Sequence, residues 1–117
     1  MNKFQVDRAE WARFSIFEQM GNIGSEVGRA IKSYRSGNTE RFQGAFDRAL
    51  DLFDATTEVL IANHSYRVRE VLLAREEFTR LFFDGTFEAD AEALERYFTN
   101  FAVAARLGAQ DSIALTN

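Results

Sequence analysis

The sequence predicts an all-α fold: an antiparallel up-down-up-down four-helix bundle with a short N-terminal lead-in helix. The chain of 117 residues contains no proline, which is the commonest helix breaker. Apolar residues recur at alternating spacings of three and four over four long segments, the period of an amphipathic helix. Short connections between these segments make neighbouring helices antiparallel. We expect a single domain over residues 1–117, with its core at about residues 15–107.

A short lead-in helix is expected over residues 8–13, and the first long helix follows it. Asp7 and Glu10 have the form of a capping pair. The run Ser15-Ile16-Phe17-Glu18 is a capping box, and Ser36-Gly37-Asn38 is a typical helix stop. The core-facing stripe of this helix consists of Ile16, Met20, Ile23, Val27, Ala30 and Tyr34.

Two further helices are expected before and after a turn at residues 62–65. Asn38 or Thr39 caps the earlier one, and the later one ends at Asp84-Gly85, because glycine suits the left-handed residue beyond a helix. The stripe of the earlier helix is Phe42, Phe46, Ala49, Phe53, Thr56 and Leu60. That of the later helix is Val68, Val71, Leu72, Phe78, Leu81 and Phe82.

The last helix is expected to begin at an Asp90 cap and to end at Gly108. The final nine residues then look loosely held. Its stripe is Leu94, Tyr97, Phe98, Phe101, Ala104 and Ala105.

Three glycines, Gly21, Gly24 and Gly28, lie within eight residues of the first long helix. Each costs about 1 kcal/mol relative to alanine in a helix interior, unless close packing offsets that cost. Because Ile23 and Val27 keep the apolar stripe unbroken across them, we expect a flattened helix surface that large neighbouring rings approach closely. A local kink and a ligand-binding loop are the alternatives.

Composition and charge limit the classes of function. The formal net charge of −4 disfavours a protein that mainly coats nucleic acid, because such binding depends on Lys and Arg. The absence of cysteine excludes disulfides and thiolate metal sites. No segment has the apolar length of a signal peptide or membrane span, so we expect a cytoplasmic protein without a membrane partner. We expect neither a cofactor nor a bound metal.

The titratable residues give little support to an enzyme. The single histidine, His64, falls in the expected turn, whereas di-iron bundles use two Glu-x-x-His pairs and nucleophilic triads need a histidine beside the nucleophile. An acidic stripe lies opposite the apolar face of its helix, so we expect it to face solvent. A Mg²⁺-dependent hydrolase that uses this stripe is the second functional alternative. The stripe consists of Asp47, Asp51, Asp54 and Glu58.

Five cations are the best candidate for a basic patch that contacts an acidic partner or nucleic acid, which is the first functional alternative. Those near the end of the first long helix also complement its dipole. Arg75 falls in the apolar seam of its helix and therefore needs a partner such as Glu26, or a place at a subunit interface. The five cations are Arg29, Lys32, Arg35, Arg67 and Arg69.

Apolar side chains beside the main stripes exceed what one interior requires, and this surplus carries the main functional hypothesis. Exposed apolar surface is typical of protein–protein contact. We therefore expect a non-catalytic, homo-oligomeric accessory or adaptor protein, whose further protein partner is unknown. The surplus residues are Phe14, Phe17, Ile31, Leu52, Leu72, Phe83 and Phe87.

Four segments carry a resemblance to a known family: FEQMGNIGSEVGRA, AFDRALDLFDAT, RVREVL and YFTNFAVAAR. Across about residues 11–106 the chain resembles small uncharacterised helical proteins of bacteria, a family without an assigned activity. More distantly, the helix order and the stretch QMGNIGSEVGR are similar to four-helix proteins encoded within intervening sequences of ribosomal RNA genes, and to the accessory protein of diversity-generating retroelements. The distant resemblance implies a ring-like homo-oligomer that touches nucleic acid through a basic surface.

Overall fold

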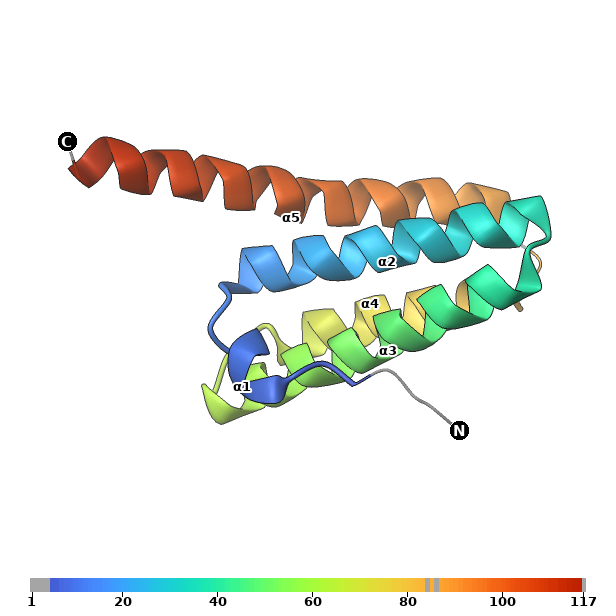
Figure 1. Ribbon diagram of the computed structural model, residues 1–117, viewed down its shortest axis with the longest axis horizontal. Helices are drawn as coiled ribbons and strands as arrows, with labels where there is room; N and C mark the ends of the chain where they lie inside the picture. The colour runs from blue at the N-terminus through green and yellow to red at the C-terminus, as the bar shows by residue number, and fades with distance from the viewer. Residues whose placement is uncertain (1–4, 84, 86, 117) are drawn as a thin grey trace.

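The computed structural model describes residues 5–83, 85 and 87–116, with side chains as far as Gly108. Over these residues the chain is all-helical, with five helices and no strand. Within the same ranges, no helix has the length and apolar character needed to cross a membrane. The helices are α1 (Arg8–Trp11), α2 (Ile16–Ser36), α3 (Thr39–Ala62), α4 (Val68–Leu81) and α5 (Phe87–Thr116) (Figure 1).

The four long helices form a closed ring of neighbours. Helix α2 packs against α3 and α5, and α4 also packs against both of these helices. The contacts of α2 are the most extensive, and those between α4 and α5 are the sparsest of the four. The short α1 lies against α3, and Figure 1 shows the C-terminal end of α5 extending beyond the start of α2.

The helix ends follow local hydrogen bonding for the first half of the chain. Ser15 and Glu18 form the complete capping box, so α2 begins as expected. Gly37 ends α2 in the left-handed region at φ 74°, and the Asn38 side chain accepts from Arg41 N to begin α3. The α3–α4 turn includes His64, which is exposed and also has a positive φ of 53°.

The expected ends of the last helix are wrong. Helix α5 begins at Phe87, so Asp90 lies in its first turn and not at the position before the helix. The helix also continues through Gly108 to Thr116, although a helix stop was expected there. The side chains beyond Gly108, together with Asn117, lie outside the described residues, as does Asp84 of the expected Asp84-Gly85 stop. Gly85 itself has a φ of 78°.

Aromatic rings join the helices in the core. The buried Phe53 ring of α3 lies 6.0 Å from the ring of Phe78 on α4 and 5.9 Å from that of Phe98 on α5. Two residues expected to be surplus belong to this core, because Ile31 is 0% and Leu52 only 6% exposed. The prediction that Ile31 and Leu52 are surplus to the core is therefore wrong.

The glycine-rich stretch of α2 is helical throughout and faces α5, but its three glycines differ in how closely they are packed. A Cβ at Gly24 would come 2.6 Å from Phe98 Cβ, nearer than real Cβ contacts allow. At Gly21 it would meet Ala102 Cα at an ordinary 3.5 Å. At Gly28 no described residue, apart from the neighbouring backbone of α2 itself, lies within 4 Å of such an atom, so the expectation of close packing is wrong there.

The difference between Gly24 and Gly28 predicts opposite effects of one substitution. Gly24→Ala should lower the free energy of unfolding by about 1–3 kcal/mol, because the new methyl group overlaps Phe98 and the helices must separate. Gly28→Ala should raise it by up to about 1 kcal/mol, because alanine favours the helix and meets no obstacle. Urea unfolding followed by circular dichroism measures both, and equal effects of the two substitutions would contradict the packing described here.

Candidate functional site

The five cations expected to form a basic patch do not lie together. Figure 1 shows that the end of α2, which carries Arg35, and the start of α4, which follows Arg67, lie at opposite ends of the molecule. Arg35 bonds Glu88 at 3.0 Å and lies over the Phe87 ring, on the side of α5. The single patch predicted from the sequence is therefore wrong.

Arg67 and Arg69 also have separate surroundings. The Arg67 guanidinium lies 5.6 Å from the ring centroids of both Phe17 and Tyr66, and its NH1 lies 3.3 Å from Glu70 Oε2. Arg69 is exposed at the edge of a groove between α4 and α5. Of the five predicted residues, Arg29 and Lys32 share a groove with each other.

That shared groove, which we call the α2–α3 groove, is basic and has a volume of about 690 Å³. Its cations are Arg29 and Lys32 from α2 with Arg41 and Arg48 from α3. Sequence reasoning missed Arg41 and Arg48, although their spacing of seven places them on one face of a helix.

The charges of the α2–α3 groove are only partly neutralised. Glu26, which is largely buried, accepts from Arg29 and, at 2.8 Å, from Arg48. Lys32 and Arg41 make no side-chain ion pair with any residue in the described part of the chain. The groove therefore presents two cations that make no ion pair in the described part of the chain, two that are already paired, and one acid, Glu40.

A second groove lies between α4 and α5, where these helices make their sparsest contact. We call it the α4–α5 groove, and its volume is about 590 Å³. Leu73, Ala74 and Leu94 give it apolar walls, and Arg69 and Glu77 are among the charged residues at its edge. Grooves of this size with apolar walls and few polar groups are typical of binding surfaces.

A hydrogen bond crosses the α4–α5 groove. The Tyr97 hydroxyl of α5 donates to Glu70 Oε1 of α4 at 2.9 Å. Burial raises the pKa of Tyr97 well above its usual 10, and the hydrogen bond and negative charge of Glu70 raise this pKa further, while Arg67 lowers it. The phenol is therefore neutral at physiological pH and holds the two helices together.

Several large apolar side chains of and beside α4 are exposed to solvent. Tyr66 is 87% exposed, Leu72 46%, Leu73 50% and Phe83 76%. Leu72 was expected in the core stripe, but the buried face of α4 contains Val71, Ala74, Phe78 and Leu81 instead. We call Tyr66, Leu72, Leu73 and Phe83 the α4 apolar face.

The other expected surplus residues do not form an equivalent face. Phe17 lies 6.2 Å from the Phe101 ring, and Phe87 packs on Tyr34 at 4.7 Å, so both are partly covered by the chain itself. Phe14 is 44% exposed but rests edge-on against Trp11. Of the expected surplus residues, Phe83 just after α4 and Leu72 on α4 are the most exposed.

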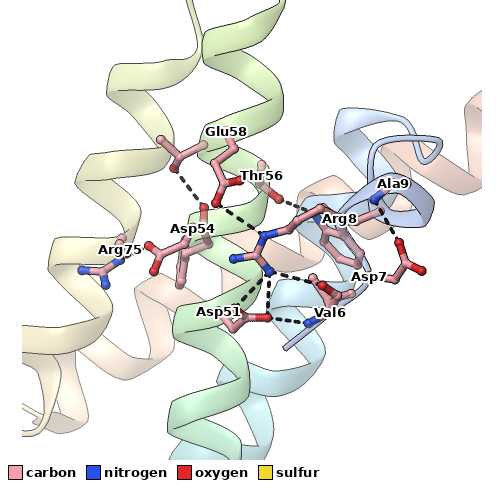
Figure 2. Close-up of polar contacts among 12 residues, drawn as sticks. Val6, Asp7, Arg8, Ala9, Asp51, Asp54, Thr56, Glu58 and Arg75 are labelled. Atoms are coloured by element: carbon pink, nitrogen blue, oxygen red, sulfur yellow. Dashed lines mark hydrogen bonds and ion pairs between the residues drawn. The ribbon is translucent and has the colours of Figure 1, made fainter. Parts of the chain in front are cut away.

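The acidic stripe of α3 does not simply face solvent. Asp51 is largely buried and accepts from Val6 N at 2.7 Å and from the Arg8 guanidinium at 3.0 Å (Figure 2). Glu58 bonds the same guanidinium at 3.4 Å. This side of α3 therefore holds the N-terminal segment, and the expectation of a wholly solvated face is wrong.

The remaining acids of the stripe have other partners. Asp54 pairs with Arg75 at 3.0 Å, which corrects the expected Arg75–Glu26 pair, and Figure 2 shows these residues on adjacent helices. Asp47 accepts from Gln43 on its own helix. Across the described ranges, no three histidine or carboxylate side chains are grouped so that they could hold a metal ion.

The Tyr97–Glu70 hydrogen bond predicts a pH dependence. Below about pH 10 its stabilisation is fully present. Above that pH the unfolded chain releases the Tyr97 proton while the folded chain retains it, so unfolding becomes easier by up to about 1.4 kcal/mol per pH unit. Tyr97→Phe lacks this dependence, so the stability difference between wild type and variant should shrink from about pH 9 to pH 11 in urea unfolding. A constant difference would contradict the assignment.

Comparisons with models of protein families, with curated proteins and with solved structures find no match to this chain.

Proposed function

We propose that the protein is a non-catalytic accessory or adaptor protein that associates with itself through α4. In this proposal the four long helices form an up-down-up-down bundle, which the ring of neighbouring contacts and the two-residue turn at Gly37-Asn38 support. The observation that carries the self-association is the α4 apolar face, with Tyr66 87% and Phe83 76% exposed. Exposed apolar side chains that follow one helix in this way are covered in many proteins by a partner.

The neighbouring α4–α5 groove supports the same surface. Its apolar wall continues the exposed apolar surface at Leu73, and charged residues lie at its edge. Protein interfaces likewise have an apolar centre and a polar rim. An accessory protein also binds another macromolecule, so it needs a second surface besides the one through which it associates with itself. The α2–α3 groove lies on a different pair of helices and would remain open in such an assembly.

Substitution of the exposed leucines tests self-association. Leu72→Ser with Leu73→Ser should weaken the association constant by about tenfold or more, because each leucine buried at an interface contributes on the order of 1 kcal/mol. Val103→Ser, which changes an exposed apolar residue of α5, is the control and should have little effect. Sedimentation equilibrium measures the constants. A strictly monomeric wild type would refute the proposal.

A second candidate function rests on the α2–α3 groove, which favours contact with the phosphate backbone of a nucleic acid. Four cations and one acid, Glu40, line it, and Lys32 and Arg41 have no ion pair within the described part of the chain. Lys and Arg side chains that neutralise phosphates make such binding strongly salt-dependent. The net charge of −4 is that of the whole chain, and it does not prevent cations from being concentrated in this groove.

Titration with a single-stranded RNA oligonucleotide at several salt concentrations tests this second function. Lys32→Glu with Arg41→Glu should weaken binding and lower the slope of log affinity against log salt by about 2. Arg13→Glu with Arg106→Glu makes the same change of charge outside the groove and is the matched control. Equal losses in both double variants would show attraction by net charge alone.

A further inference from the structure

Leu72 and Leu73, in the middle of the α4 apolar face, lie between charges of opposite sign. Arg69 precedes Leu72 and Leu73 along α4, and Glu76 and Glu77 follow them. All three charged side chains are exposed. None of them makes an ion pair with another described residue, whereas Arg67 pairs with Glu70 and Arg75 with Asp54 on either side. The outer side of α4 thus has an apolar centre, with Arg69 before it and with Glu76, Glu77 and then Arg80 after it.

Arg69 cannot pair with an acid along its own helix. Side chains pair along a helix when they are three or four residues apart, and no acid stands at those distances from Arg69. Glu76 is seven residues away, which is about 10 Å along the axis. Glu76 and Glu77 have Arg80 four and three residues after them, whereas Arg69 needs an acid from another helix.

We propose that a second copy of this chain covers the α4 apolar face, with the two α4 helices antiparallel about a two-fold axis beside Leu72 and Leu73. This inference rests on the self-association proposed above and names its partner and geometry. Arg69 of each copy then faces Glu76 and Glu77 of the other, and the leucines of both copies meet at the centre.

The spacing of the residues fixes this arrangement. Arg69 lies three residues before Leu72, and Glu76 lies three residues after Leu73, so each is about 5 Å from the centre along the helix axis. An antiparallel two-fold contact pairs positions at equal distance on opposite sides of its centre. A parallel contact would instead place Arg69 against Arg69 and acids against acids, which is unfavourable.

Charge reversal tests the geometry without disturbing the core, because every substituted side chain is exposed. Arg69→Glu places like charges opposite Glu76 and Glu77, and Glu76→Arg with Glu77→Arg places them opposite Arg69. Each variant alone should self-associate about tenfold or more weakly than the wild type. An equimolar mixture of the two variants should form heterodimers of about wild-type strength, because opposite charges again face each other at both ends.

Sedimentation equilibrium of the separate and mixed variants gives these constants, and thermal unfolding followed by circular dichroism shows that each variant folds. Arg106→Glu is the control for a general charge effect. Three results would overturn the two-fold geometry while leaving self-association in place. The charge-reversed variants could associate as strongly as the wild type, their mixture could fail to recover wild-type strength, or the wild type could have the mass of a larger ring. A monomeric wild type would overturn the proposed function and this inference together.

Discussion

The close approach of α2 and α5 at Gly24 and Phe98 is the constraint on which the arrangement of the long helices depends. Helix α2 lies between α3 and α5 and makes the most extensive contacts of the fold. A side chain at position 24 would overlap Phe98 at 2.6 Å, so the missing Cβ sets how near α5 can come. Held against α2, helix α5 makes only sparse contact with α4, and the α4–α5 groove opens there.

The helical class and most helix ends could be predicted because they depend on neighbouring residues in the chain. Ser15, Asn38 and Gly37 act through hydrogen bonds or backbone conformation within a few residues, which a sequence displays directly. The C-terminal end of α5 differs from the prediction because the local signal at Gly108 is too weak to stop a helix. Gly108 costs a helix only about 1 kcal/mol, and no proline follows to stop it.

The grooves could not be predicted, because their charges come from different helices. The sequence prediction grouped Arg67 and Arg69 with the cations of α2. The end of α2 and the start of α4, however, lie at opposite ends of the molecule (Figure 1). Arg75 reaches Asp54 on α3, and Glu26 instead joins Arg29 and Arg48. The same limit affected Gly28, because only the position of α5 reveals that the space beside it is open.

The anchoring of the N-terminal segment on α3 has an optical consequence. Trp11 is the chain's single tryptophan, is 4% exposed and donates its indole N–H to the buried Thr56 hydroxyl at 2.9 Å. Its fluorescence therefore reports on this segment alone. Release of the segment would shift the tryptophan emission toward the red while the long helices kept their ellipticity. The two signals together therefore distinguish detachment of the N-terminal segment from unfolding of the whole protein.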